Sequence, residues 1–180
     1  MPRGGNPLSV RDRRRPVILA LALVSLAPSW PALAEHVHEP PHGGALQVLG
    51  DEAAHVELVL ERGAGRLTAY LLDGEAERAV RIAAPVLELR VDRIDGADAS
   101  PAVRPFVLSL AAVANVLTGE TVGDTSQFEV TDARLAGVKR LAGEIPAITV
   151  RGMRFERVRL LVPEGNETLP GGLEAGKEMP

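Results

Sequence analysis

The stretch HVELVLERGAGRLTAYLL, residues 55–72, carries the clearest strand pattern in this chain. Apolar and polar side chains alternate over 55–60 and again over 66–72, which is the period of a β-strand with one buried face. The intervening ERGAG contains two glycines, and a short glycine-containing loop between two such runs indicates a β-hairpin. We therefore predict an antiparallel hairpin, in which His55 and Glu57 share the face opposite to Val56.

Similar short runs recur along the chain, separated by turn residues, and they predict further strands. These runs are residues 45–49, 79–82, 86–91, 106–110, 128–130, 147–150 and 155–162. Residues 92–105 are polar and end at a proline, so we expect a loop there, and residues 133–141 are the one plausible short helix. Long amphipathic helices between the strands are missing, which argues against a parallel α/β sheet. The pattern predicts an all-β fold, a β-sandwich (Ig-like or two packed antiparallel sheets) with at most one short helix.

Residues 1–34 have the three parts of a secretory signal peptide: a basic stretch, an apolar run over 17–26, and Ala32-Leu33-Ala34 as a cleavage site. The apolar run is about ten residues, whereas a membrane-spanning helix needs roughly twenty. We predict cleavage after Ala34 and a periplasmic or secreted protein, the alternative being an uncleaved anchor. The rest of the chain contains no segment of the length and apolarity of a membrane span.

Cleavage would leave residues 35–180, a length common for one domain. We expect 35–41 to form a flexible His/Pro arm, 42–162 the sandwich, and 163–180, rich in Pro, Gly and Glu, a disordered tail. Of 20 basic and 24 acidic residues the leader removes five and one, leaving 15 and 23, a formal net charge of −8. Such a charge disfavours binding to nucleic acid. The absence of cysteine excludes disulfides and thiolate metal sites.

All four histidines lie near the start of the expected mature chain, at positions 36, 38, 42 and 55. In an extended segment His36 and His38 point the same way, and His55 shares its strand face with Glu57. Imidazole and carboxylate ligands suit Zn(II), Cu(II) and Ni(II). We predict a divalent transition-metal site whose candidate ligands are His36, His38, His42, His55 and Glu57.

Two considerations complicate this metal site. If residues 45–49 pair with 55–60, the hairpin does not by itself bring His42 next to His55. If cleavage leaves Glu35 as the first residue, its amine, an amide nitrogen and the His36 ring can chelate Cu(II) in a plane, with His38 as a fourth ligand. In the alternative interpretation His42 hydrogen-bonds within a turn, and His55 with Glu57 forms a solvated patch.

Several segments resemble a small module of exported bacterial proteins. They are PHGG at 41–44, GDEAAHVELVL at 50–60, LTAYLLDGEAERAV at 67–80, ANVLTGETVGDTSQFEV at 114–130 and ITVRGMRFERV at 148–158. A His-Gly-Gly segment followed by a His-x-Glu strand is similar to uncharacterised periplasmic proteins and to the N-terminal region of some periplasmic adaptor subunits of heavy-metal efflux pumps. The resemblance covers about residues 42–166.

The resemblance implies metal binding or handover at His42, His55 and Glu57, and efflux-pump components as partners. The chain departs from the adaptors because it lacks their long helical hairpin and lipoyl-like segments, so it is not a complete adaptor. Scarce methionine and absent cysteine also argue against a dedicated Cu(I) carrier.

Sequence motifs of the common enzyme classes are missing: the chain has no G-x-S-x-G, HExxH, P-loop or dinucleotide fingerprint. Asp124 and Ser126 in GDTS resemble a catalytic loop, but these are also ordinary turn residues. We therefore expect a protein that is not an enzyme. Our first hypothesis is an exported metal-binding protein, accessory to heavy-metal efflux; the second is a periplasmic interaction module that uses sheet edges or strand faces and binds no metal.

Overall fold

The computed structural model describes residues 38–96 and 104–166. The elements are β1 Ala45–Leu49, β2 Ala54–Glu61, β3 Arg66–Leu72, β4 Val86–Gly96, β5 Phe106–Ala112, β6 Gln127–Thr131, the 3-10 helix η1 Ala133–Leu135, β7 Val138–Val150 and β8 Met153–Val162. This part of the chain contains no α-helix, so the all-β prediction is confirmed. The expected signal peptide and His36 lie outside the described residues.

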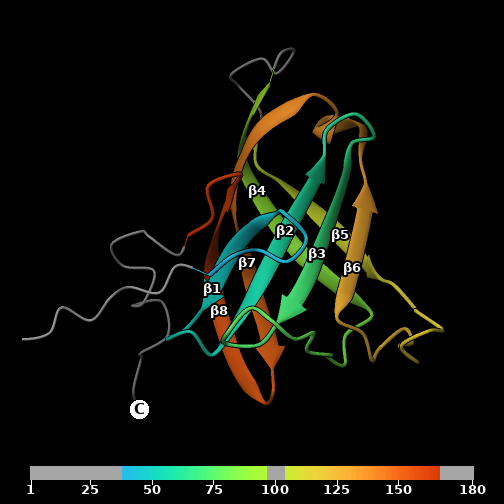
Figure 1. Cartoon of the computed structure of the whole chain (residues 1–180). Helices are drawn as coiled ribbons and strands as arrows, with labels where there is room; N and C mark the ends of the chain where they lie inside the picture. The colour runs from blue at the N-terminus through green and yellow to red at the C-terminus, as the bar shows by residue number, and fades with distance from the viewer. Residues whose placement is uncertain (1–37, 97–103, 167–180) are drawn as a thin grey trace, which may run out of the picture. The chain divides into compact units, whose positions relative to one another are not determined.

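The predicted hairpin is present, because β2 and β3 pair antiparallel from His55↔Leu72 to Glu61↔Arg66. All eight strands belong to one antiparallel sheet in the order β1-β2-β3-β6-β5-β4-β7-β8. The sheet curls on itself, so that β2, β3 and β6 lie in front of β4 and β5 in Figure 1. We expected two packed sheets; the described strands instead form one sheet that is nearly closed into a barrel.

Long, irregular strands explain the curling. The β4–β7 ladder contains register shifts between Val91 and Arg93 and between Asp95 and Gly96. At Gly143 in β7 a Cβ atom would lie 2.1 Å from the Arg90 carbonyl oxygen, so only glycine allows this approach. Bulges and glycines bend a sheet and increase its twist, which favours closure over two flat layers.

Side-chain amides bridge the two edge strands β1 and β8. Gln47 donates from Nε2 to the Leu161 carbonyl oxygen at 2.9 Å and accepts from the Leu161 amide at 3.1 Å. The Asn166 side chain accepts from the Val48 amide at 2.6 Å and donates from Nδ2 to the Arg159 oxygen at 2.9 Å, while the Asn166 backbone amide donates to the Leu46 oxygen at 3.1 Å. These bonds connect the two edges, which have no backbone ladder between them, and they satisfy several of the backbone groups there.

Hydrophobic side chains fill the inside of the sheet, including Leu58, Leu89, Leu108, Phe128, Ile145 and Leu160, all fully buried. The outer face of β1–β3 is also covered, because Leu46, Leu72 and Ala76 form a second small apolar cluster there. By register this outer face carries His55 opposite Val48 and Leu72, and Glu57 opposite Leu46 and Tyr70. Of the expected metal ligands, His55 and Glu57 therefore lie on the outer face, in a small second layer outside the main core.

Three local expectations differ from the structure. Strand β4 continues to Gly96, although residues 92–105 were expected to be a loop, because Val91 and Ile94 still bury side chains in the core. Residues 79–82 form only isolated bridges, Leu72↔Ala79 and Ile82↔Thr125. The segment 133–141 is helical only in η1 and then enters β7, since the turn at Gly137 (φ +72°) ends the helix.

Candidate functional site

The segment before β1 turns over the outer face of β2. The Gly43 amide donates to the Pro40 oxygen at 3.1 Å, closing a β-turn with Pro41 in its second position. Gly43 has φ +69°, and a Cβ on Gly44 would lie 2.6 Å from the Leu58 oxygen. The two glycines thus permit a left-handed residue followed by a close backbone approach, which places His42 over β2.

Glu57 anchors this turn. Its side chain is fully buried and accepts from the His42 amide (2.9 Å to Oε1, 3.2 Å to Oε2), from the Gly44 amide (2.8 Å to Oε1) and from the His42 ring (Nδ1 to Oε2, 2.7 Å). A buried carboxylate is costly unless such donors surround it. Both oxygens are therefore engaged by the turn, and Glu57 holds the arm in place.

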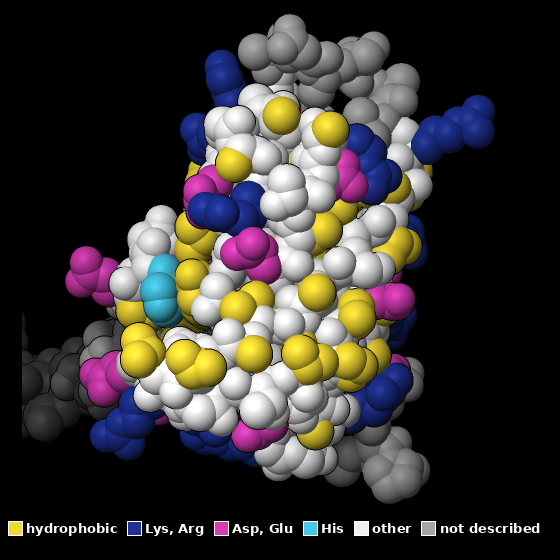
Figure 2. Space-filling model, turned by 90° about the vertical axis from the view of Figure 1, so that its right-hand side faces the viewer, with side chains coloured by type: hydrophobic (Ala, Val, Ile, Leu, Met, Phe, Trp, Pro, Cys, Tyr) yellow, Lys and Arg dark blue, Asp and Glu magenta, His cyan; other side chains and the backbone are white. Residues whose placement is uncertain are grey.

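The His42 ring lies flat on Tyr70, with ring centroids 3.7 Å apart and an interplanar angle of 7°. Because a carboxylate accepts at Nδ1, this nitrogen carries the proton in the neutral ring and Nε2 keeps a lone pair. The side chain is 41% exposed. On the face in Figure 2 a histidine reaches the surface among hydrophobic side chains.

His55 is fully buried on the same strand face as Glu57. Its Nδ1 lies 3.0 Å from the backbone oxygen of Asp73, a pure acceptor, so Nδ1 is the protonated nitrogen. Its Nε2 is buried and has no hydrogen-bond partner within the described residues. Buried polar atoms normally have a hydrogen-bond partner, so this lone pair is available to bind a ligand.

The turn after β3 fixes the carbonyl that orients His55. The Asp73 carboxylate accepts from the amides of Glu77 and Arg78 at 3.0 and 3.1 Å. Burial alone would raise the pKa of Asp73, but these two hydrogen bonds, together with the charges of Arg78 and Arg151, hold the pKa below its ordinary value of 3.8. The hydrogen bonds thus fasten the Asp73 turn beside the backbone oxygen that His55 contacts.

His38 approaches His55 from the arm. The two ring centroids are 4.9 Å apart and the ring planes are tilted by 59°. The structure thus pairs His38 with His55 and His42 with Glu57 and Tyr70, an arrangement that the sequence did not specify. Within residues 38–96 and 104–166, no group of three or more His, Cys, Asp or Glu side chains is arranged to hold a metal ion.

Tyr70 and Asp73 belong to this arrangement, and sequence reasoning missed both. Tyr70 lies opposite Glu57 in the hairpin register, a relation the strand pattern already contained. Asp73 contributes a backbone oxygen, for which side-chain patterns give no signal.

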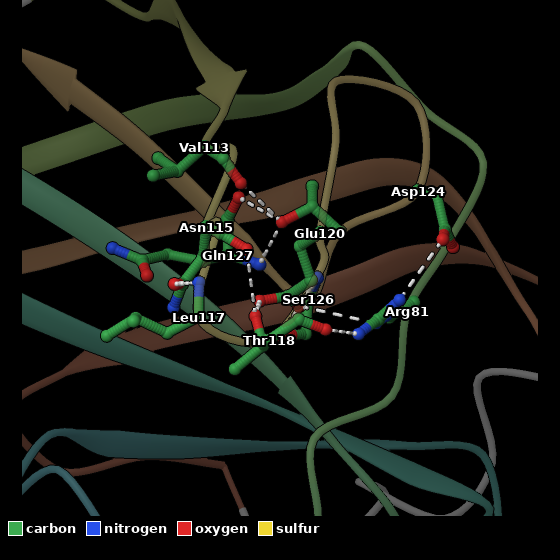
Figure 3. Close-up of polar contacts among 10 residues, drawn as sticks. Arg81, Val113, Asn115, Leu117, Thr118, Glu120, Asp124, Ser126 and Gln127 are labelled. Atoms are coloured by element: carbon green, nitrogen blue, oxygen red, sulfur yellow. Dashed lines mark hydrogen bonds and ion pairs between the residues drawn. The ribbon is translucent and has the colours of Figure 1, made fainter.

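The GDTS segment lies in a different polar cluster, drawn in Figure 3. Ser126 donates from Oγ to Glu120 Oε1 at 2.5 Å, and Thr118 donates to Glu120 Oε2 at 2.6 Å. Arg81 lies between Glu120 (Nε, 3.8 Å) and Asp124 (3.3 Å). The Ser126 hydroxyl is thus hydrogen-bonded to a carboxylate and not to an imidazole. The contacts of this cluster connect the loops that carry Arg81, Glu120 and Ser126.

Comparison with protein-family models, with curated proteins and with solved structures finds no match to this chain. Among the described residues, no helix has the length and apolar character needed to cross a membrane.

Proposed function

We propose that this is an exported, non-catalytic protein that binds a divalent transition-metal ion, Zn(II), Cu(II) or Ni(II), through His55 and the arm histidines. The observation that carries the proposal is the buried His55 Nε2, which has a lone pair, no hydrogen-bond partner among the described residues, and the His38 ring beside it. Metal-bound histidines usually donate their other ring nitrogen to a carboxylate or a backbone carbonyl. His55 donates to a carbonyl and His42 to a carboxylate.

The ring separation supports a shared ion. Two imidazoles that bind one zinc ion at about 2.0–2.1 Å have centroids roughly 5 Å apart. The separation between His38 and His55 is 4.9 Å, which is compatible with one shared ion and supports the proposal.

Two protein ligands leave further coordination positions. In our proposal His42 and His36 are the candidates for one of them, and water or an exchangeable ligand takes the rest. Glu57 acts as a positioning residue that fastens the arm, since its oxygens already accept hydrogen bonds from His42 and Gly44. An open coordination sphere suits handover, which agrees with an accessory role in heavy-metal efflux.

The test is calorimetric titration of residues 35–180 with Zn(II), Cu(II) and Ni(II). We expect a dissociation constant of about 1 µM or lower, which corresponds to about −8 kcal/mol. His55→Ala and His38→Ala should each weaken binding at least tenfold, His42→Ala and His36→Ala less. Glu75→Ala, in the exposed turn after β3, is the matched control and should leave binding unchanged.

Binding weaker than about 1 µM for all three ions would refute the proposal and favour the interaction module that binds no metal. Tight Cu(II) binding that survives His55→Ala and disappears with His36→Ala would assign the metal to the amino-terminal arm and refute the role of His55.

A further inference from the structure

Strands β4 and β7 separate along part of their length. They pair from Arg90↔Glu144 to Gly96↔Val138. Before that point, Val86 to Leu89 pair with β5 on one side only, and Ile145 to Val150 pair only with β8. The sheet wall therefore splits into a fork with one strand edge on each side.

The fork encloses a cleft of about 400 Å³. Residues 82–84 and 86–88 line one wall and residues 146–149 the other. Three of these lining residues, Ile82, Leu87 and Ile148, are buried members of the main core, so the floor of the cleft is the barrel interior. Ala84, Val86 and Ala147 add small side chains at the rim.

The walls present backbone as well as apolar surface. A strand edge carries N–H and C=O groups that pair with any extended chain that reaches them. A fork with two edges offers pairing on both sides of an inserted strand, which an ordinary outer edge does not. Pro146 removes one donor from the β7 wall, so the β4 wall supplies the more regular edge.

Charge narrows the choice of occupant. Glu88 is the one charged residue among those lining the cleft, its side chain is exposed, and it takes part in no ion pair within the described residues. The chain after residue 34 carries a formal charge of −8. A peptide segment with a basic side chain would be attracted by the carboxylate of Glu88 and by the net negative charge of the chain.

We propose that this cleft is a peptide-binding site that accepts an extended, basic segment of a partner protein as an additional strand between β4 and β7. About four residues would span Val86 to Leu89, at roughly 3.3 Å per residue. In the bound peptide, every second side chain is small and aliphatic and points to the floor formed by Ile82, Leu87 and Ile148. A Lys or Arg of the peptide, next to one of these residues in sequence, forms an ion pair with Glu88. Backbone pairing supplies affinity and the floor supplies selectivity.

The probe is a heptapeptide of alternating valine and threonine with a lysine at each end, titrated into isotope-labelled residues 35–180. We expect a dissociation constant near 100 µM and slowed hydrogen exchange at the amides of the fork, including those of Val86 and Glu88. The same peptide with its alternate backbone nitrogens methylated is the matched ligand control. It keeps the side chains, loses the donors, and should bind at least tenfold more weakly.

Glu88→Lys should weaken peptide binding at least fivefold, while Glu75→Lys, on the exposed turn after β3, should leave it unchanged. Both substitutions are on exposed residues, so both variants should fold, which the amide spectrum checks. The result should be the same with and without Zn(II), since the cleft shares no residue with the histidine site.

Three outcomes would overturn the proposal. The first is no slowed exchange in the fork at about 1 mM peptide, a threshold near −4 kcal/mol. The second is equal affinity for the methylated peptide, which would indicate apolar contact without strand pairing. The third is a protein dimer that protects the same amides without peptide, which would identify a second copy as the occupant.

Discussion

Two carboxylates, Glu57 in β2 and Glu120 in the loop before β6, are both buried and are both stabilised by hydrogen bonds, but from different partners. Each accepts several hydrogen bonds and fastens a segment without regular secondary structure to the sheet. Glu57 is fully buried and is held by amides and an imidazole. Glu120 is 7% exposed and is held by two hydroxyls, an amide and, at 3.8 Å, a guanidinium.

The difference lies in what surrounds each carboxylate. Glu120 has the permanent charge of Arg81 beside it and accepts hydrogen bonds from the hydroxyls of Thr118 and Ser126. Both carboxylate oxygens in the cluster of Figure 3 therefore have partners within the cluster. Beside Glu57, on the same strand face, His55 has a buried Nε2 without a hydrogen-bond partner in the part of the chain that the structure describes. Satisfied polar clusters stabilise a fold, whereas an incomplete one next to an anchored arm points to a ligand.

The largest expected effect comes from removing Glu57. Glu57→Ala leaves the amides of His42 and Gly44 and the His42 ring without their acceptor, and should lower the free energy of unfolding by about 3 kcal/mol. Glu120→Ala should cost about 1–2 kcal/mol, because the exposed Thr118 and Arg81 can turn towards water and only the buried amide and hydroxyl of Ser126 lose their acceptor. Urea unfolding of the two variants measures both. Equal losses would show that Glu57 is no more demanding an anchor than Glu120.

Replacing His55 should separate stability from binding. His55→Leu removes a buried nitrogen that has no partner among the described residues, but it also removes the hydrogen bond from Nδ1 to the Asp73 oxygen. Because these two effects oppose each other, unfolding without metal should change by no more than about 1 kcal/mol. Zinc at 100 times its dissociation constant should stabilise the parent protein by about 2.7 kcal/mol and this variant not at all. Thermal unfolding with and without Zn(II) tests this, and an unchanged zinc shift in the variant would contradict the proposed site.

The free energy of unfolding should depend on pH through the carboxyl group of Glu120, whose pKa is shifted in the folded protein. Burial would raise the pKa of Glu120, but hydrogen bonds from Ser126 and Thr118, with the charge of Arg81, hold it below its ordinary 4.5. A carboxyl whose pKa is lower in the folded state stabilises the fold above the unfolded pKa, and this is lost as pH falls through the folded value. Stability should therefore fall below about pH 4.5. Glu120→Gln should flatten that fall, and an unchanged profile would contradict the assignment.

The smallest effect is expected at Tyr70. Tyr70→Leu removes the ring stacked on His42 and should cost about 1 kcal/mol. Because Glu57 still holds His42 through its amide and Nδ1, zinc affinity should change less than threefold. A larger loss of affinity, with stability preserved, would mean that the stack and not the carboxylate orients the arm.

Local patterns predicted much of the strand content. The expected runs 45–49 and 66–72 coincide with β1 and β3, since alternation and flanking turn residues lie within a few residues of each strand. The full lengths of β4 and β7 were missed, because polar residues such as Asp92 and Lys139 occupy the outward positions of long strands and resemble a loop.

The proximity of the candidate ligands was predicted in part, while the metal site itself stays a prediction. His38, His42, His55 and Glu57 do lie on or against one strand face, as the clustering of histidines indicated. Their pairing was not predictable, since His42 meets Glu57 across 15 positions through a turn and a hairpin. His55 is oriented by the Asp73 oxygen, which no side-chain pattern reveals.

Alternation, turns and composition were sufficient to establish an all-β chain without cysteine and with its histidines gathered at one end, because these properties depend on near neighbours along the chain. Closure into a near-barrel, the fork between β4 and β7, and the contact of His38 with His55 depend on which strands pair, and a period of two assigns faces but not neighbours. The long-range contacts between strands therefore decide how the sheet is arranged. They also decide where His55 Nε2 lies, the buried nitrogen without a partner among the described residues on which the proposed function rests.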